Sequence, residues 1–347
     1  MSQKYCVVGS GGIGGIVAAL LAETDKDVTA ITRNEVIAAS LRAHGFQLRG
    51  DGLPRAVTAK VSVGIPEGQT FDFVILATQP PDVERAAREI APSLAEDGRI
   101  VCLQNGLCED RVASIVGKDR VLGAVVAWGA TMPEPGVYDR TAQGGFTLGR
   151  MDGSLDPRAE ELALALECIG PVELTQNLQG KRWSKLAINC AISSLGTLGG
   201  DRLGALMPHR FVRRLALEIM TEVVSVAKAE GVKLEKVAGT IDLPFITLSE
   251  EDRVAAGSPA LVAKHALLLA VGFRYRRMRS SMLSAIERGR APAVDFLNGE
   301  IVTRGVAHGI DTRVNAAVQR MVWELAEKKR APGMDTLDAL FEATAPH

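Results

Sequence analysis

A glycine-rich turn near the beginning of the chain has the residue types and the spacing of a phosphate-binding site. Gly9, Gly11 and Gly14 follow an apolar stretch at the spacing G-x-G-x-x-G. In a strand–turn–helix unit, the first glycine permits the tight turn, the second lets backbone amides approach a pyrophosphate, and the third lets the helix lie close to the sheet. The helix N-terminus adds free N–H groups and a partial positive charge. We therefore expect a dinucleotide to bind at Gly9–Gly14.

The residue that follows the next predicted strand indicates which dinucleotide is bound. Asp27–Thr32 alternates and is rich in β-branched residues, which predicts a strand. Strand, glycine turn, helix and second strand within about thirty residues form the context that makes the motif informative. NAD sites place Asp or Glu at the end of this strand, whereas this chain has Arg33. A guanidinium suits a 2′-phosphate, so we predict NADPH; the alternative is a solvated arginine at a strand end.

Amide side chains follow two later apolar runs. Phe73–Ala77 is typical of a buried parallel strand and leads to Gln79, and the predicted strand Arg99–Leu103 leads to Asn105. Ligands of open α/β sheets bind at the carboxyl ends of the strands, which makes both amides candidate site residues. For Asn105 the alternative is a turn residue that precedes Gly106.

One predicted helix in the second half of the chain carries a row of polar residues. Lys185, Asn189 and Ser193 stand at i, i+4 and i+8 and therefore share one face of this helix. A lysine in such a mostly apolar helix is either a surface residue whose stem covers apolar neighbours or a functional ammonium in a cleft. Composition alone does not decide between these two interpretations.

The order of the predicted elements divides the chain into two domains. Strands and helices alternate up to about residue 175, which predicts a doubly wound, Rossmann-type α/β domain over 1–175. From Gly180 onward the periodicity is helical, which predicts an all-α substrate and catalytic domain over 176–347. Further strands of the sheet are predicted at 121–127, 144–149 and 171–174. Helices of the second domain are predicted at 182–195, 210–230, 258–288 and 292–308.

Composition and charge narrow the class of protein. The 347 residues are 47% hydrophobic and 23% charged, which is typical of a soluble globular protein. The net charge of −1 and the lack of a basic stripe argue against nucleic acid as a partner. Tyr5–Ala22 is uncharged but contains five glycines, and each costs about 1 kcal/mol in a helix interior, which argues against a membrane span.

The cysteines predict the cellular compartment of the protein, and the histidines do not predict a metal site. The five cysteines are odd in number and form no C-x-x-C pair, so we expect a protein of the reducing cytoplasm. The five histidines are scattered and show no metal-ligand spacing. The apolar run Ala266–Phe273 is compatible with a homodimer interface, although such runs more often belong to a core.

Taken together, these motifs resemble the ketopantoate reductase (2-dehydropantoate 2-reductase) family over nearly the whole chain. The resemblance lies in their order and spacing rather than in any one of them. The motifs are VVGSGGIGG, the strand-end Arg33, LQNG around Asn105, W-x-K-L-x-x-N at Trp183–Asn189, SSML at Ser280–Leu283, DFLNG at Asp295–Gly299 and GI at Gly309–Ile310.

The resemblance implies an NADPH-dependent reduction of a 2-oxo acid, with 2-dehydropantoate and (R)-pantoate as the leading substrate and product. Lys185 would bind the 2-oxo oxygen and act as general acid, and Asn105 would lie near the nicotinamide and the substrate. An ammonium at this position stabilises the charge that develops on oxygen and then supplies a proton. The expected cofactor-binding residues are Gly9, Ser10, Gly11, Gly12, Ile13, Gly14, Arg33, Gln79 and Asn105.

The resemblance also implies a set of substrate-binding residues. Asn189 would hold a substrate hydroxyl or support Lys185, and Ser281 would bind the carboxylate. Ser193 and Asn298, the latter from the DFLNG motif, complete the expected set.

Several positions depart from the pattern of the family. Gln79 stands where the family usually has lysine, Ser193 where it usually has a second asparagine, and Ala285 and Ala293 where it has acids. The loss of polar groups points to a substrate less polar than ketopantoate. Two alternatives therefore accompany the main hypothesis: a reductase of a different, less polar 2-oxo acid or imine, and a non-catalytic NADPH sensor.

Overall fold

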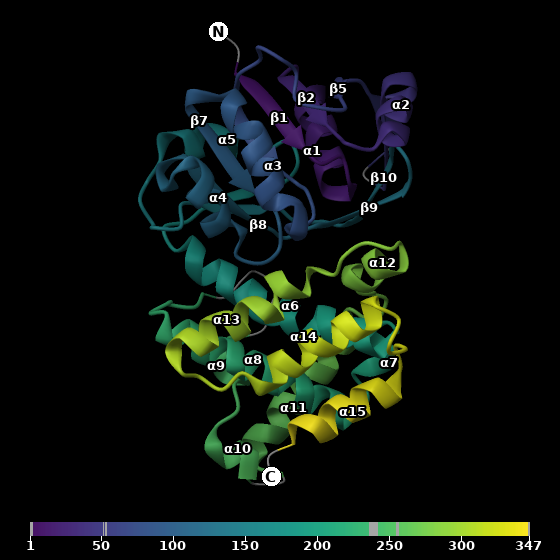
Figure 1. Ribbon diagram of the computed structural model, residues 1–347, viewed down its shortest axis with the longest axis vertical. Coiled ribbons are helices and arrows are strands. Elements are labelled where there is room, and N and C mark those ends of the chain that lie inside the picture. The colour runs from purple at the N-terminus through teal and green to yellow at the C-terminus, as the bar shows by residue number, and fades with distance from the viewer. Residues whose placement is uncertain (1–2, 51, 53, 236–241, 255–256, 346–347) are drawn as a thin grey trace. The chain divides into compact units, whose positions relative to one another are not determined.

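The computed structural model describes residues 3–50, 52, 54–235, 242–254 and 257–345, and its elements are labelled in Figure 1. The chain forms two compact units, 1–179 and 180–347. The first unit combines strands with helices, and the described residues of the second are helical. This arrangement confirms the predicted class, a Rossmann-type α/β unit followed by an all-α unit.

The first unit is built on a sheet of eight strands in the order β12-β11-β8-β7-β6-β1-β2-β5. β1 lies between β2 and β6 and is parallel to both, with Cys6 opposite Thr29 and Val74. The strand order therefore reverses at β1, and ligands of such sheets bind at this reversal, beyond the carboxyl ends of the strands. The strands are β1 (Lys4–Val8), β2 (Asp27–Ile31), β5 (Lys60–Ser62), β6 (Phe71–Leu76), β7 (Leu94–Cys102), β8 (Val121–Val126), β11 (Phe146–Gly149) and β12 (Val172–Leu174).

The strands predicted at 121–127, 144–149 and 171–174 are confirmed as β8, β11 and β12. β11 runs antiparallel to β8, whereas β7 and β8 are parallel. The helices of this unit are α1 (Gly12–Glu23), α2 (Glu35–His44), α3 (Val83–Ile90), α4 (Cys108–Val116) and α5 (Pro157–Leu166).

A second sheet was not expected from the sequence. Its four strands have the order β4-β3-β10-β9, and β3 pairs with β10 although about ninety residues separate them. Helix α2 ends at His44, because Gly45 has φ +69° and the chain continues as a strand. The strands are β3 (Phe46–Arg49), β4 (Arg55–Val57), β9 (Gly129–Glu134) and β10 (Val137–Ala142).

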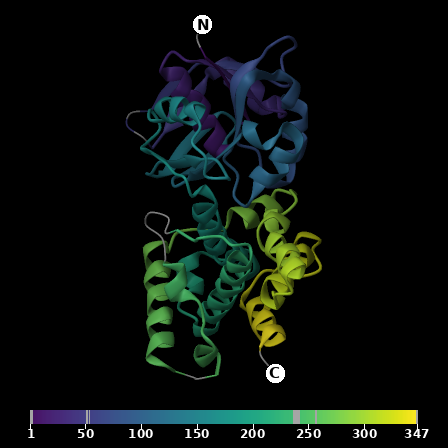
Figure 2. The same cartoon turned by 90° about the vertical axis from the view of Figure 1, so that its left-hand side faces the viewer.

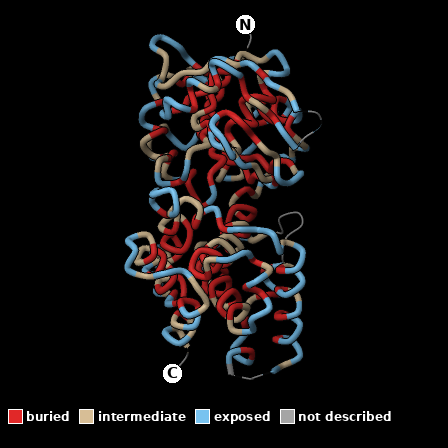
Figure 3. The backbone as a smooth tube through the Cα atoms, turned by 90° about the vertical axis from the view of Figure 1, so that its right-hand side faces the viewer, coloured by how far each residue is buried: buried red, intermediate tan, exposed pale blue. Residues whose placement is uncertain are grey.

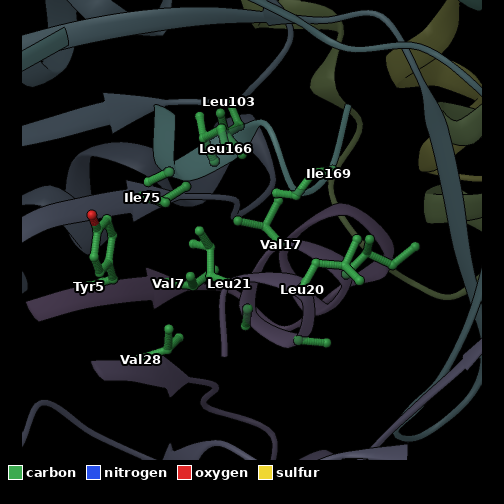
Figure 4. Packing of buried hydrophobic residues seen from close by; sticks show 14 of the residues in the cluster. Tyr5, Val7, Val17, Leu20, Leu21, Val28, Ile75, Leu103, Leu166 and Ile169 are labelled. Atoms are coloured by element: carbon green, nitrogen blue, oxygen red, sulfur yellow. The ribbon is translucent and has the colours of Figure 1, made fainter. Parts of the chain in front are cut away.

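Helix α1 lies between the two sheets, because it packs against β1 and β2 of the large sheet and against all four strands of the small one. Its residues 14–21 are all buried, which explains why the stretch Tyr5–Ala22 is so apolar. The Tyr138 hydroxyl of β10 donates to the carbonyl of Ser10 at 3.0 Å. Figure 4 shows part of the core, where Leu21 of α1 lies beside Val7 of β1.

The strand predicted over Arg99–Leu103 begins earlier in the structure, at Leu94 of β7. α3 ends at Ile90, a 3₁₀ turn that contains Pro92 follows, and β7 begins at Leu94. Proline cannot continue a helix, because it lacks the backbone N–H and its ring clashes with the preceding turn. The early part of β7 pairs with β6 across an irregularity in register.

The second unit consists of helices, shown from another side in Figure 2. The helix expected over 210–230 is confirmed as α8. This helix forms the centre of the unit, because it contacts α9, α11, α13, α14 and α15. The buried residues of the unit are red in Figure 3. The helices are α6 (Leu178–Gly199), α7 (Leu203–Leu206), α8 (Arg210–Ala229), α9 (Leu243–Ile246), α10 (Glu250–Val254), α11 (Pro259–Arg274), α12 (Ser281–Glu287), α13 (Asn298–His308), α14 (Arg313–Ala326) and α15 (Met334–Thr344).

The helix expected over 258–288 is two helices, α11 and α12. The segment between them is not helical, because its carbonyls form hydrogen bonds with another helix. The carbonyls of Arg276 and Met278 accept hydrogen bonds from the first N–H groups of α7. Ser280 then begins α12, and its hydroxyl accepts from the backbone N–H of Leu283. None of the helices in the described parts of the chain combines the length and apolar character needed to span a membrane.

Candidate active site

The turn after β1 needs glycine at two of the predicted positions. Gly9 has φ +104°, and a Cβ there would lie 2.9 Å from the carbonyl carbon of Ala77 at the end of β6. A Cβ on Gly14 would lie 1.9 Å from the carbonyl oxygen of Gly9. The first glycine therefore lets the chain pass close to the neighbouring strand, and the second lets α1 begin directly above the turn.

The beginning of α1 is open and suited to an anion. Gly11, its N-cap, is exposed, and a Cβ placed there would have no atom within 4 Å. No side chain caps the helix and its first turn holds no acid, whereas the N-terminus of α2 is capped by the Asn34 carboxamide. The hydroxyl of buried Ser10 has no hydrogen-bond partner among the residues that the structure describes. Free N–H groups, the helix dipole and open space are features that a pyrophosphate-binding site requires.

Arg33 follows β2 at the carboxyl edge of the sheet, the same edge as the turn. Its side chain is 63% exposed, and its Nη1 lies 3.8 Å from Oε1 of Glu89 on α3. An exposed pair at this distance contributes about 0–1 kcal/mol, so the guanidinium can turn to a phosphate at little cost.

Gln79 and Asn105 lie at the same edge, after β6 and β7, and both are exposed. The residues that precede them, Thr78 and Gln104, connect the ends of the two strands. Nε2 of Gln104 donates a hydrogen bond to Oγ1 of Thr78 at 3.2 Å. Sequence reasoning did not assign a function to this pair. Its position, immediately before two predicted site residues, suggests that it holds the two loops in register.

In the second unit, Lys185 and Asn189 are half-buried on one face of α6. Burial lowers the pKa of Lys185 to about 7, and the positive charge of Arg182 acts in the same direction. Nδ2 of Asn189 is buried and has no hydrogen-bond partner among the described residues. An ammonium near its pKa at neutral pH and an unengaged amide donor one turn away can bind and protonate an oxygen.

Ser193, one turn further along α6, is half-buried, and its carbonyl accepts from Oγ1 of Thr197 at 2.7 Å and from Oγ of Ser280 at 2.9 Å. The Ser280 contact joins α6 to the beginning of α12. Ser281, the residue predicted to bind the carboxylate, is exposed in the first turn of α12. Ser280 therefore caps α12 and connects it to α6. A serine immediately before a predicted helix is a typical N-cap, so the sequence contained a signal for this structural role.

Asn298 does not fit its expected role in substrate binding. Its side chain is 0% exposed, and both of its N–H donors are used, toward the carbonyl of Cys190 at 3.2 Å and toward Oδ1 of Asn315 at 2.9 Å. Its Oδ1 accepts from the hydroxyl of Ser194 at 2.6 Å. Cys190 and Ser194 lie on a different face of α6 from Lys185, so Asn298 belongs to the packing of the helices.

The same buried network contains Asn315 and Glu222, to which the sequence had not assigned a role in the site. Both carboxylate oxygens of Glu222 accept from the first turn of α14, and Oε2 also accepts from Nδ2 of Asn315 at 2.7 Å. The network therefore connects α8, α14, α13 and α6.

Two further positions depart from the pattern of the family, Ala285 in α12 and Ala293 at the start of a short 3₁₀ turn. Both alanines are half-buried.

The fold and the phosphate-binding turn define the class of the protein: a dinucleotide-binding Rossmann protein with an additional helical unit. The family model described as ketopantoate reductase PanE/ApbA matches residues 5–153, and the model of its C-terminal part matches residues 177–326. These matches cover most of the chain, which therefore belongs to the ketopantoate reductase family.

Individual proteins agree with this assignment. The 2-dehydropantoate 2-reductase of Pyrococcus horikoshii is 26% identical over 334 residues, which cover 95% of this chain and 99% of that protein. The crystal structure of a PanE/ApbA family ketopantoate reductase from Ralstonia eutropha JMP134 has 25% identity and a TM-score of 0.79, with 95% and 100% of the two chains covered. A D-mandelate dehydrogenase solved with NADH and anilino(oxo)acetate shares the fold at 19% identity, with a TM-score of 0.77 over 97% and 99% of the chains.

Proposed function

We propose that this protein is an NADPH-dependent oxidoreductase that reduces 2-dehydropantoate to pantoate, with Lys185 as general acid. The observation that carries the proposal is the pair on α6, a half-buried lysine with a pKa of about 7 and an asparagine whose amide nitrogen has no hydrogen-bond partner within the described part of the chain. Membership of the ketopantoate reductase family and relatives named 2-dehydropantoate 2-reductase support this substrate.

In this proposal the first unit holds the cofactor and the second unit holds the substrate. The open turn Gly9–Gly14 would take the pyrophosphate, Arg33 the 2′-phosphate, and Gln79 and Asn105 would lie near the nicotinamide. When bound, NADPH supplies the hydride that reduces the carbonyl carbon of the 2-oxo acid. Two features of this chain fit the pyrophosphate of NADPH: the start of α1 has no side-chain cap, and there is open space in front of Gly11.

Lys185 has the chemistry that the oxygen of the substrate requires. As the carbonyl carbon is reduced, negative charge develops on the 2-oxo oxygen, and a nearby ammonium stabilises that charge. The same ammonium then donates its proton, so that an O–H bond forms and a neutral lysine remains. We assign to Asn189 the orientation of a substrate oxygen through its unengaged Nδ2, and to Ser193 and Ser281 further contacts to the substrate.

A second candidate function is the reduction of a less polar 2-oxo acid. The observation that favours it is the apolar character of α6 around the lysine: Ile188 and Ile192 are half-buried and lie close to the row of polar residues. Both isoleucines also line a small apolar cavity together with Leu268 and Val271 of α11. A side chain without a hydroxyl would suit these surroundings better than the hydroxymethyl group of ketopantoate.

We also propose that the protein acts in a reducing compartment such as the cytoplasm. None of the five cysteines, all of which lie among the described residues, forms a disulfide. Proteins of oxidising compartments more often use paired cysteines for stability.

The decisive experiment is an NADPH oxidation assay with ketopantoate beside 2-oxo acids that have aliphatic or aromatic side chains. The wild-type protein should turn over ketopantoate, and Lys185→Ala should lower kcat by about 10²–10⁴-fold, because the proton donor is lost. Lys228→Ala, which removes an exposed lysine of α8, is the control and should retain wild-type activity.

Three other outcomes would change the proposal. A clear preference for an apolar 2-oxo acid would favour the second candidate. NADPH binding without turnover of any substrate in the panel would favour a sensor. A Lys185→Ala variant with kcat near the wild-type value would contradict the role of the lysine.

A further inference from the structure

The outward face of α11 is apolar over about three turns. The exposed positions between Val262 and Phe273 carry no polar side chain. Three of them are large, with Val262 57%, Leu269 44% and Phe273 72% exposed, and the others are alanines. The complete set is Val262, Ala263, Ala266, Leu269, Ala270 and Phe273, which we call the α11 face. Helix periodicity places these six residues on one side of α11.

The polar residues of the same helix are turned inward. Lys264 and His265 are both buried, at 6% and 8% exposure. The Lys264 ammonium donates to the carbonyl of Thr247 at 2.6 Å and is paired with the carboxylate of Asp252 on α10. A surface helix normally has the opposite pattern, with apolar residues toward the core and charged residues toward water. The sequence of α11 is therefore arranged for contacts on both sides.

The α11 face lies on the outer side of the helical unit. In Figure 2, α11 is the green helix at the outer edge of this unit, and in Figure 3 its outward turns are pale blue while its inward turns are red. Its inner side is fixed closely, because a Cβ on Gly272 would lie 2.3 Å from Cβ of Met207. An apolar stripe about 17 Å long, at 1.5 Å per residue, is thus presented on a rigid element.

The α11 face is complementary to a second copy of itself. If two α11 helices cross antiparallel about a two-fold axis between residues 267 and 268, Phe273 of one copy lies opposite Val262 of the other. Leu269 then lies opposite Ala266 in the same way. Each large side chain meets a smaller one, which is how the surfaces of two helices interdigitate. A two-fold interface requires this kind of self-complementarity.

The charges at the two ends of the helix are also complementary in this orientation. Glu250 and Glu251 are exposed on α10 and outnumber its one exposed arginine, Arg253, whose guanidinium lies 3.9 Å from Glu250. α10 is held against the first turn of α11 by a hydrogen bond from Ser258 Oγ to Asp252 Oδ1 at 2.9 Å. Arg274 and Arg277 are exposed at the other end of α11. Antiparallel pairing brings the acidic end of each copy to the basic end of the other, whereas parallel pairing would oppose like charges.

From these observations we infer that the α11 face binds a second copy of this chain as a two-fold dimer, with Phe273 and Leu269 at the centre of each half and the charged ends at the rim. Stable interfaces bury about 1,200–2,000 Å² in total, so residues around the helix contribute to the contact beside the six of the α11 face. This inference does not depend on the proposed reaction, because none of its residues was placed in the cofactor or substrate site.

The first test measures molar mass by light scattering and sedimentation over a series of protein concentrations. The wild-type protein should have the mass of two chains, and the double variant Leu269→Glu/Phe273→Glu should associate at least about a hundredfold more weakly, because four carboxylates would meet across the axis. The matched control is Val306→Glu on α13, an apolar residue outside the α11 face that is 77% exposed, and this variant should remain dimeric. Circular dichroism checks that each variant is folded.

The second test addresses the orientation of the two copies. One variant reverses the acidic end (Glu250→Lys/Glu251→Lys), and the other reverses the basic end (Arg274→Glu/Arg277→Glu). Each variant alone should dimerise more weakly than the wild type, because like charges then meet at both rims. An equimolar mixture should restore the dimer, since each end again meets its opposite.

Three results would overturn the inference. A wild-type protein that is monomeric throughout the concentration series would contradict the dimer, even if the α11 face bound a different protein. A Leu269→Glu/Phe273→Glu variant that is as dimeric as Val306→Glu would place the interface elsewhere. Charge-reversed variants that do not recover in the mixture would exclude the antiparallel arrangement. None of these results changes with the outcome of the NADPH assay.

Discussion

Lys185 combines a partly buried position with a depressed pKa, and this combination has a consequence for the pH dependence of the reaction. A general acid must carry its proton at the start of the step, and a pKa of about 7 means that Lys185 is protonated below pH 7 and neutral above it. The value of kcat/KM for reduction should therefore be constant below about pH 6 and fall about tenfold per unit above about pH 8. The measurement is the NADPH oxidation assay across this range.

Lys185→Arg is the matched variant for this profile. A guanidinium stays protonated throughout the range, so the variant should be slower and its profile should lack the fall near pH 7. A wild-type value of kcat/KM that rises through pH 7 would indicate instead that the neutral amine is the active form.

Arg33 should determine the preference for the phosphorylated cofactor. Replacement by serine removes the charge that would meet the 2′-phosphate, and the loss of charge-assisted hydrogen bonds should weaken NADPH binding by about 10–100-fold. NADH has no such phosphate, so its affinity should change much less. Titrations of both cofactors measure the two affinities.

Arg88→Ser on α3 is the control for Arg33, because Arg88 is similarly exposed, at 61%, and similarly paired with a glutamate. It should leave both affinities unchanged. Equal losses for NADPH and NADH in the Arg33 variant would mean that Arg33 acts on another part of the cofactor.

The beginning of α14 depends on a carboxylate from another helix. Thr312, its N-cap, makes no side-chain capping bond, and Glu222 of α8 accepts instead from the N–H groups of Val314 and Asn315 at 2.9 Å each. Burial raises the pKa of Glu222 to about 7, even though these hydrogen bonds favour the ionised form. The folded protein therefore binds this proton more tightly than the unfolded chain does.

From this shift we predict how stability depends on pH. Between pH 4.5, the usual pKa of the group, and about pH 7, the contribution of Glu222 to the free energy of unfolding should decrease as pH rises and then level off. Glu222→Gln should remove this part of the slope. It should also cost about 1–3 kcal/mol, because the new amide places N–H groups against N–H donors.

Melting temperatures between pH 4.5 and 8 measure both effects of the Glu222 variant. Glu327→Gln, at the exposed C-terminal end of α14, should behave like the wild type. A pH slope that is the same in the Glu222 variant and in the wild type would show that another group causes it.

For the whole molecule, dimerisation should make stability depend on concentration. If only the folded chain pairs through the α11 face, the melting temperature of the wild type should rise with protein concentration by mass action. The Leu269→Glu/Phe273→Glu variant should show a much smaller dependence, and Val306→Glu should follow the wild type. A wild-type melting temperature that is independent of concentration would contradict the dimer.

Much of the fold could be predicted because its signals are local. The strand, glycine turn and helix around Gly9 follow from neighbouring residues, as does the amphipathic helix α8. The small sheet could not be predicted, because its strands are short and β3 pairs with a segment about ninety residues away. The break between α11 and α12 was also missed, because it depends on hydrogen bonds to α7 rather than on the residues of the break.

The sequence by itself determined the class of cofactor site, the row Lys185–Asn189–Ser193 and the family resemblance, because residue type and spacing are enough for each. Only the tertiary structure decided which polar residues remain available. It buried Asn298 in a network between helices, left the amide of Asn189 without a partner among the described residues, and turned Lys264 inward and Phe273 outward. Burial and partners depend on segments that are distant in the chain, and a one-dimensional pattern does not contain them.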